Sequence, residues 1–202
     1  MTPLEKPPLN IGFLGLDVVL MVPNKCGVSS IVSALDKAGF KSRVPPHLLL
    51  TYGTAIAIMR DPFERFLSCY VGHVGPKRHH ENLKYLFPKP VSLLKFAAYV
   101  AAHDDKDSDI HFASQMCRFG VDPDRAVMLS ELDVWWSQDF AHALNSAGIP
   151  VSTKLMRLNQ SSNFAPNINP CIYAMVRERF AIDYEWIKAL TAWQMPPREK
   201  WL

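Results

Sequence analysis

The sequence has no long hydrophobic run, no closely spaced cysteine pair and no strong excess of either charge. Its longest apolar stretch, residues 11–22, is interrupted by Asp17. It is shorter than the roughly 20 apolar residues that a membrane-spanning helix needs. The N-terminus also lacks the basic and then apolar pattern of a signal peptide. We therefore expect a cytoplasmic protein that does not interact with a membrane.

Cysteine use and net charge exclude further classes of protein. The four cysteines are widely separated, with no CxxC pair, which argues against a zinc site and a disulfide-dense fold. We interpret them as unbridged thiols: Cys26, Cys69, Cys117 and Cys171. The net charge of +3 is too small to indicate nucleic-acid binding. It is compatible with an anionic ligand that a few placed cations hold.

The 202 residues, 49% of them hydrophobic, suffice for one domain of the larger kind. Residues 1–10 are proline-rich and predict a disordered lead-in, so the domain is expected over residues 11–202. Short apolar runs at residues 17–23, 54–59 and 126–129 predict strands. Helical patterns alternate with them, which predicts an α/β domain with a mainly parallel central sheet flanked by helices.

Capping signals and apolar spacing locate the helices. The clearest start is Asp61-Pro62-Phe63-Glu64, where Asp61 suits the N-cap, Pro62 the first helical position and Glu64 a capping box. Helices are predicted at residues 29–38, 62–70, 91–102 and 132–147, and one or two more within 167–190. Residues 72–90 are polar, basic and interrupted by proline and glycine, and they predict a long surface loop.

The first chemical signal is the turn between the first predicted strand and the helix that follows it. A turn with Gly27 leaves backbone N–H groups unpaired at the start of a helix, where they and the helix dipole attract anions. Lys25 adds a positive charge, and Ser29 and Ser30 add hydroxyl donors. The segment is not a Walker A motif. A capped helix start with one exposed lysine is the alternative interpretation.

The second signal follows the next strand. Arg60 comes at the carboxyl end of that strand, where open α/β sheets bind ligands. Arg65 and Ser68 are three residues apart, so they share one face of the following helix. Arginine and hydroxyl groups that converge suit a phosphate, although a capped helix with surface ion pairs is the alternative. Adjacent parallel strands would place both signals at one edge, as a 3′,5′-bisphosphorylated nucleotide requires.

These residues resemble the nucleotide-binding signatures of the carbohydrate sulfotransferases that use 3′-phosphoadenosine 5′-phosphosulfate (PAPS), the Golgi-type enzymes and their bacterial and viral relatives. Residues 25–30 resemble the family's 5′-phosphosulfate loop, and residues 60–70 are similar to its 3′-phosphate segment over nearly the whole length. Weaker similarities follow in the family's order at residues 109–115, 127–133, 158–162 and 176–185.

The resemblance implies a P-loop-like three-layer fold and an activity. A sulfuryl group would pass from PAPS to a hydroxyl of a carbohydrate-like acceptor, leaving 3′-phosphoadenosine 5′-phosphate (PAP), with no metal. Lys25 would contact the leaving 5′-phosphate, the backbone after it would cradle that phosphate, and Arg60 and Ser68 would hold the 3′-phosphate. The implied donor-binding residues are Lys25, Cys26, Gly27, Val28, Ser29, Ser30, Arg60 and Ser68.

The base that takes the acceptor's proton has several candidates. His47 precedes the second strand, where related enzymes can carry a catalytic histidine, and His111 lies in the best-matching histidine motif. The pair His79-His80 is a weaker candidate, and Glu131 is a carboxylate alternative. A lone histidine is often structural, so the choice between His47 and His111 stays open at this point.

Other features allow more than one interpretation. The basic residues within 72–90 fit an anionic acceptor or a solvated loop, and Trp135 and Trp136 fit sugar stacking or the core. Asn24 stands where the family usually has proline and Phe112 where it has tryptophan, so a non-catalytic nucleotide- or glycan-binding protein is an alternative. An ATP-dependent P-loop kinase is another, but it should show a full Walker A motif. The oligomeric state stays open.

Overall fold

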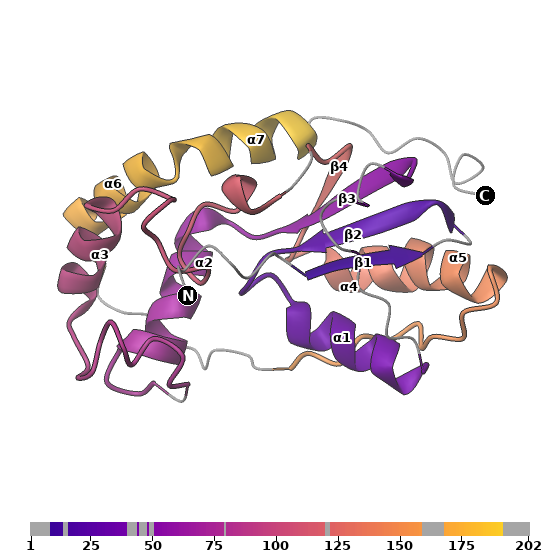
Figure 1. Ribbon diagram of the computed structural model, residues 1–202, viewed down its shortest axis with the longest axis horizontal. Coiled ribbons are helices and arrows are strands. Elements are labelled where there is room, and N and C mark those ends of the chain that lie inside the picture. Colours follow the sequence, from indigo (N-terminus) through magenta and orange to yellow (C-terminus); the bar gives the residue numbers. More distant parts are fainter. Residues whose placement is uncertain are drawn as a thin grey trace.

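The computed structural model describes residues 9–13, 16–39, 44, 48, 51–78, 80–119, 122–158 and 168–191. Its centre is a four-stranded sheet of order β1-β2-β3-β4. The strands are β1 (Leu9–Phe13), β2 (Val18–Val22), β3 (Thr54–Met59) and β4 (Arg125–Met128). β1 is antiparallel to β2, whereas β2, β3 and β4 are parallel. The fold is thus α/β with a mainly parallel sheet, which confirms the predicted class (Figure 1).

The helices lie close to the ranges that the sequence predicts. The single predicted helix at 132–147 contains a π-helical segment, and the range 167–190, predicted to hold one or two helices, holds two. In chain order the elements are α1 (Val28–Lys37), α2 (Pro62–Cys69), the π-helical turn η4 (Tyr70–Val74), α3 (Leu93–Ala101), the 3₁₀ turn η5 (Met116–Arg118), α4 (Leu132–Trp135), the π-helical η6 (Trp136–Phe140), α5 (Ala141–Ser146), α6 (Pro170–Arg179) and α7 (Ala181–Thr191). No helix of the described residues is long and apolar enough to cross a bilayer.

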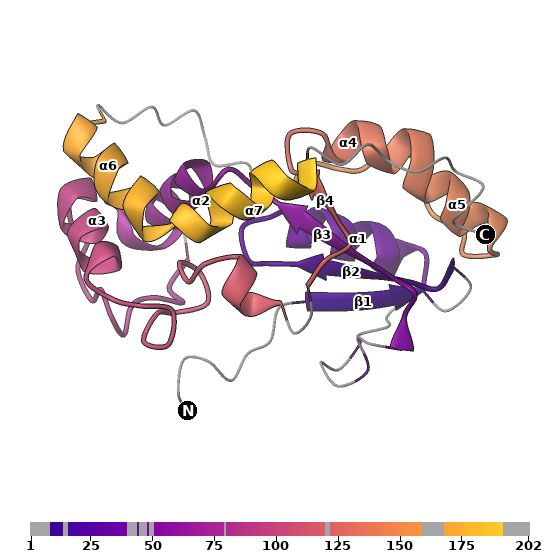
Figure 2. The same ribbon diagram turned by 90° about the horizontal axis from the view of Figure 1, so that it is seen from above.

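Both faces of the sheet are covered, because successive residues of a strand point to opposite sides. Leu20 packs in a cluster with Ile31 of α1 and Leu144 of α5. Its neighbour Met21 belongs to a second cluster, against which Ile187 of α7 packs. Figures 1 and 2 show α1, α4 and α5 on one side of the strands and α7 on the other. This arrangement is compatible with a three-layer domain.

A separate helical lobe adjoins the sheet. In it α2, α3 and α6 share a core in which Phe66 and Phe96 stack with their ring centroids 4.9 Å apart. The stretch 72–90, predicted to be a surface loop, is only partly one. Its first residues belong to η4, and Leu83 and Phe87 are buried in the same core. The chain between η4 and α3 is therefore anchored in this core at Leu83 and Phe87.

The sequence analysis did not predict β1, whose first two residues lie in the segment interpreted as a lead-in. The apolar stretch 11–22 holds parts of two antiparallel strands that meet near Asp17, which has a φ of 51°. A side chain at Gly12 would place its Cβ 2.1 Å from the Tyr52 hydroxyl. Glycine is thus what allows β1 to approach the chain before β3.

Two further predictions about single residues can be judged. None of the four cysteines, all of which the structure describes, forms a disulfide bond. Trp135 and Trp136 are buried in the cluster beneath the sheet, and the Trp136 indole donates to the Ser152 carbonyl at 2.9 Å. The core interpretation of this pair is therefore the one that the structure supports.

The start of α2 confirms its predicted cap. The Asp61 carboxylate accepts a hydrogen bond from the Glu64 N–H at 2.9 Å, and Pro62 occupies the first turn. We expect Asp61→Ala to lower the free energy of unfolding by about 1 kcal/mol, because that N–H loses its acceptor. Urea denaturation would measure the loss. Asp36→Ala, at an exposed position within α1, is the control and should change stability little; equal losses in both variants would contradict the capping role.

Candidate functional site

A cleft of about 750 Å³ opens where β2, β3 and β4 end. Parallel strands place their carboxyl ends at one edge, and ligands of open α/β sheets bind there. The cleft brings together most of the predicted site, since these predicted residues line it: Lys25, Gly27, Val28, Ser29, Ser30, Arg60, Ser68 and His111. Its volume is in the range of small-molecule sites.

The turn between β2 and α1 has an unusual backbone. Gly27, with a φ of 87°, is the N-cap of α1, and no side chain caps the helix. Lys25 also has a positive φ, 72°, which costs a non-glycine residue about 1–2 kcal/mol. The first N–H groups of a helix have no acceptor within it and carry the positive end of its dipole. The cleft therefore has an anion-attracting floor.

Two cations lie over this floor. Burial lowers the pKa of the Lys25 ammonium, and the nearby Arg60 and Arg65 lower it further although Cys69 opposes them. Arg60 donates through Nη1 to the Lys25 carbonyl at 3.5 Å. Its buried Nε has no hydrogen-bond partner among the described residues and lies 3.5 Å from the Glu64 carboxylate. An anion in the cleft would stabilise the charged form of Lys25 and would give the Arg60 Nε an acceptor.

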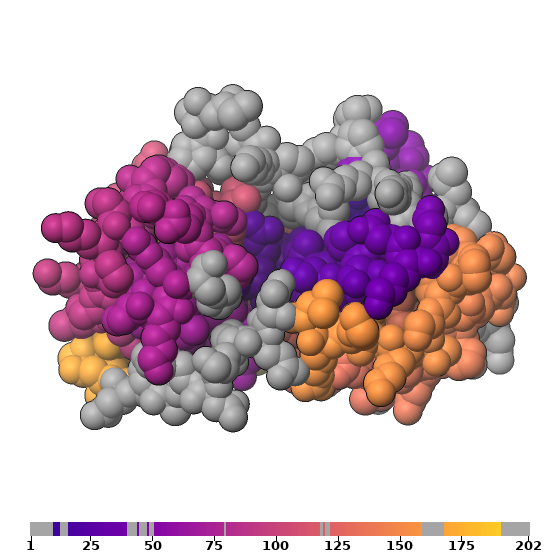
Figure 3. All heavy atoms as spheres, turned by 90° about the horizontal axis from the view of Figure 1, so that it is seen from below, coloured from indigo at the N-terminus to yellow at the C-terminus, as the bar shows by residue number. Residues whose placement is uncertain are grey.

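Arg157 and Leu158 line the cleft on the side of α1. The Leu158 N–H donates to the Ser30 hydroxyl at 3.1 Å, which leaves the hydroxyl hydrogen to donate elsewhere. Arg157, on the same rim, pairs with Asp133 of α4, with Nε 2.6 Å from the carboxylate oxygen. Figure 3 shows the segment that ends at Leu158, in orange, beside α1, in indigo.

Cys26 differs from the other predicted donor-binding residues. Its side chain is fully buried in the core beneath the sheet and does not line the cleft. Burial raises the pKa of this thiol to about 11, so it stays protonated at neutral pH. The thiol donates to the Gln115 side-chain oxygen at 3.1 Å. Its side chain thus supports the turn rather than contacting a ligand.

Gln115 joins the two loops that line the cleft. Its Oε1 accepts from the Cys26 thiol and from the Arg60 N–H at 3.0 Å, and its Nε2 donates to the Arg60 carbonyl at 2.8 Å. The side chain is fully buried. It therefore fixes the turn after β2 relative to the end of β3.

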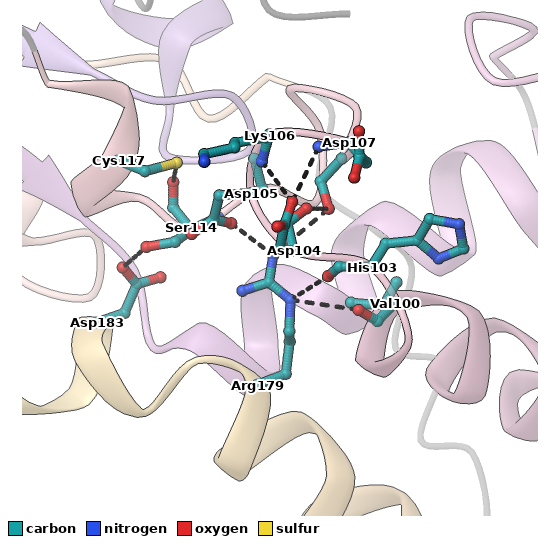
Figure 4. A network of polar contacts seen from close by, with 12 residues as sticks. Val100, His103, Asp104, Asp105, Lys106, Asp107, Ser114, Cys117, Arg179 and Asp183 are labelled. Carbon is teal, nitrogen blue, oxygen red and sulfur yellow. Dashed lines mark hydrogen bonds and ion pairs between the residues drawn. The ribbon is translucent and has the colours of Figure 1, made fainter.

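Asp183 of α7 holds Gln115 in place. Its buried carboxylate accepts from the Ser114 hydroxyl at 2.6 Å, the Gln115 N–H at 2.9 Å and the Met116 N–H at 3.0 Å. Figure 4 shows Asp183 directed at Ser114 and, beside it, Arg179 of α6. Arg179 pairs with Asp105, which in turn accepts from the Ser114 N–H at 2.7 Å. The segment before η5 is thus held from two helices.

The Arg65 guanidinium binds the main chain of the protein itself. It is only 2% exposed, and its guanidinium donates to three main-chain carbonyls, those of Asn24, Ala113 and Ile110, at 3.0, 2.6 and 3.3 Å. Arg65 and Ser68, which were predicted to share one face of α2, therefore have different roles. Ser68 lines the cleft, whereas Arg65 ties the turn after β2 to the segment before Gln115.

The histidine candidates are also separated. His111 lines the cleft, and so does His80, the weaker candidate. His73, which the sequence analysis had not singled out, lines it too. The rings of His73 and His111 lie 4.5 Å apart and those of His73 and His80 4.9 Å apart. Among the described residues, no group of three or more potential ligands is placed to hold a metal ion. His47 and His79 fall outside the described residues.

The remaining basic and acidic candidates lie elsewhere. Arg78 donates to the carbonyls of Phe87 and Pro88, at 2.5 and 3.0 Å, and so stabilises its own loop. Lys84 pairs with Glu81 at 3.0 Å. Glu131 is exposed at the N-cap of α4 and does not line the cleft. From the stretch 72–90, His73, His80 and Asn82 line the cleft.

Comparisons with models of known protein families, with curated proteins and with solved structures find no match to this chain. Its candidate site is therefore characterised by its own geometry and charge.

The Asp183 carboxylate gives a test of how the site is held. In Asp183→Asn an amide NH₂ would face backbone N–H donors, leaving at least one buried donor unpaired, so we expect a loss of about 1–3 kcal/mol in the free energy of unfolding. Glu185→Gln, an exposed change on the same helix, is the matched control. Urea denaturation of both variants measures the difference. Equal stability of the Asn variant and the control would show that Asp183 contributes nothing special.

His73 gives the protein a defined response to acid. Burial, and then the neighbouring His111 and Lys25, lower the pKa of His73 to about 3 from its usual 6.5. Between these two values the unfolded chain binds a proton at His73 and the folded chain does not. The free energy of unfolding should therefore fall as pH drops through this window, by up to about 1.4 kcal/mol per pH unit from this group.

Urea denaturation at several pH values would measure that slope. We expect His73→Gln to flatten it between pH 6.5 and 3. His142→Gln, at an exposed position of α5, should leave the slope as it is. Parallel curves for the wild type and His73→Gln would show that His73 is not held neutral.

Proposed function

We propose that this protein is a sulfotransferase with a P-loop-like domain, which moves the sulfuryl group of PAPS to a hydroxyl of a carbohydrate-like acceptor. One observation carries the proposal: two candidate phosphate sites, from two adjacent parallel strands, line a single cleft. Lys25 and the start of α1 form the first, and Arg60 and Ser68 form the second. His111 lines the same cleft and could receive a proton.

The two sites match the two ends of a 3′,5′-bisphosphorylated nucleotide. The start of α1 and Lys25 would bind the 5′-phosphosulfate, because backbone N–H groups and an ammonium suit a phosphate that gains charge as it leaves. Arg60 and Ser68 would bind the 3′-phosphate, which ATP lacks. Both carboxylates that line the cleft, Glu64 and Asp133, lie beside an arginine. This charge balance favours an anion over a magnesium nucleotide.

Transfer would proceed in line and needs mostly positioning and electrostatic stabilisation. His111 would take the proton of the acceptor hydroxyl as its oxygen bonds to sulfur. The bond between sulfur and the bridging phosphate oxygen breaks, and that oxygen keeps the electron pair and leaves as part of PAP. Lys25 would stabilise the charge that builds on this oxygen. PAPS supplies the activated sulfuryl group, and the described residues supply the positive charge.

Donor recognition can be tested by thermal unfolding with PAP, with ATP and Mg²⁺, and with AMP. A ligand that binds only the folded state stabilises it by about 2.7 kcal/mol at a hundredfold excess over Kd. We expect the clear shift with PAP, and its loss in Arg60→Ala and Ser68→Ala. Arg177→Ala, at an exposed position of α6, should retain it. A larger shift with ATP and Mg²⁺, or none with PAP, would refute the proposed donor.

Turnover separates an enzyme from a non-catalytic binding protein. We expect Lys25→Ala to lower the rate of PAP release from PAPS, measured with water and with a panel of saccharides as acceptors, by about 10²-fold or more, in the range seen when a group that stabilises a transition-state charge is removed. Its effect on PAP affinity should be much smaller. Lys95→Ala, at an exposed position of α3, is the control. Equal losses in rate and affinity, or no turnover in the wild type, would indicate a binding protein.

A further inference from the structure

His111 does not stand alone in the cleft wall. Its Nδ1 lies 2.6 Å from Oδ1 of Asp109, and the same oxygen accepts the His111 backbone N–H at 2.9 Å. The two side chains are largely buried, 12% and 11% exposed, so water competes little for this contact. Asp109 therefore holds His111 at two points, the ring nitrogen Nδ1 and the backbone N–H.

A third residue completes the arrangement. The hydroxyl of Tyr85 donates to Oδ2 of Asp109 at 2.6 Å. Tyr85 comes from the anchored stretch between η4 and α3, 24 residues before Asp109. The residue is 62% exposed, so its visible role is this hydrogen bond rather than packing. Both oxygens of the Asp109 carboxylate are thus used.

These contacts decide which ring nitrogen of His111 carries the proton. Burial acts to raise the pKa of Asp109, but the hydrogen bonds from His111 and Tyr85 outweigh it, and the pKa is lowered. At neutral pH the carboxylate is ionised and can only accept hydrogen bonds. In neutral His111 the proton must then be on Nδ1, which leaves the lone pair on Nε2.

The surroundings of the ring agree with a base. His73, the neighbour whose ring centroid is 4.5 Å away, is uncharged at neutral pH, because its pKa is lowered to about 3 by burial first of all. It therefore places no full positive charge beside an imidazolium that forms on His111. Lys25 and His80 also lower the pKa of His73. The negative charge in direct contact with His111 is the Asp109 carboxylate.

We propose that Asp109 and Tyr85 are positioning residues that hold His111 in the tautomer of a general base, with Asp109 in direct contact and Tyr85 fixing the Asp109 carboxylate. The inference rests on the proposed function for the reaction that His111 serves. His111 is then the base, and Asp109 and Tyr85 act through it.

The tautomer can be read without donor or acceptor, by ¹⁵N NMR of the histidine rings in the intact protein. We expect His111 to be protonated at Nδ1 above the pH at which it loses its charge. Asp109→Ala should abolish this preference, and Tyr85→Phe, at an exposed ring, should weaken it while the protein stays folded. A wild-type His111 protonated at Nε2, or a tautomer unchanged in a folded Asp109→Ala, would overturn the proposal. A failure of PAP to bind would refute only the proposed function.

Kinetics test whether the two residues act through His111. With PAPS as the donor and water or saccharides as acceptor, we expect the kcat for PAP release to fall about 10²-fold in Asp109→Ala, the lower end for a positioned base. In Tyr85→Phe we expect about tenfold, for one hydrogen bond to a charged group. The KM for PAPS should stay within about twofold, and Tyr173→Phe, on α6, is the control.

A double variant decides between positioning and general destabilisation. In His111→Ala, which removes the base, adding Asp109→Ala should lower kcat no further, because residues that act as one unit are not additive. If the double variant loses the full extra factor of about 10², Asp109 acts independently of His111 and the proposal is wrong.

Discussion

The buried carboxylate of Asp183 carries much of the organisation of this protein. It accepts three hydrogen bonds from consecutive residues, of which Gln115 then bonds to both loops that line the cleft. A buried charge is costly unless its lone pairs are satisfied, and here three donors from one short segment do so. Helix α7 thereby determines where the turn after β2 and the end of β3 meet. The cleft depends on a residue that does not line it.

The arginines near the cleft divide between structure and ligand. Arg65 donates to three main-chain carbonyls and is almost fully buried, so its guanidinium stabilises the main chain. Arg60 makes two weak contacts, each of 3.5 Å, to the Lys25 carbonyl and to the Glu64 carboxylate, and its Nε has no hydrogen-bond partner among the described residues. Cations that are close together and under-satisfied are unfavourable in the absence of an anion. This unfavourable arrangement lies at the position where we propose that the phosphates bind.

Local signals in the sequence were sufficient to predict most helices and strands, but they were insufficient to predict the contacts between them. β3 was predicted residue for residue, and Asp61 as the cap of α2, because a β-branched run and a capping motif act over a few residues. β1 was missed because it directly follows a proline-rich segment and its only pairing is with the strand after it. Of the residues predicted to bind a donor, all but Cys26 line one cleft, whereas the Cys26 side chain faces the core, and their role stays a prediction.

What the sequence could not indicate was which polar residues support the site. Nothing local distinguishes Arg65, which binds carbonyls, from Arg60, which lines the cleft, since both follow the same strand. The motif around His111 was identified by resemblance, but the functions of Asp109 and Gln115 within it depend on Tyr85 and Arg60, which lie far away in the sequence. His73 had no signal at all, because its burial comes from the packing of η4.

The long sequence separations within this network bear on how the molecule is made. Cys26 and Gln115 are 89 residues apart, and Ser114 and Asp183 are 69 apart. Contacts of such range close large loops, so they form late during folding. Because α7 follows every other described element, a growing chain on the ribosome can complete its sheet before the cleft exists. Assembly of the cleft would then follow assembly of the sheet, and a formed cleft would report that the described elements have folded.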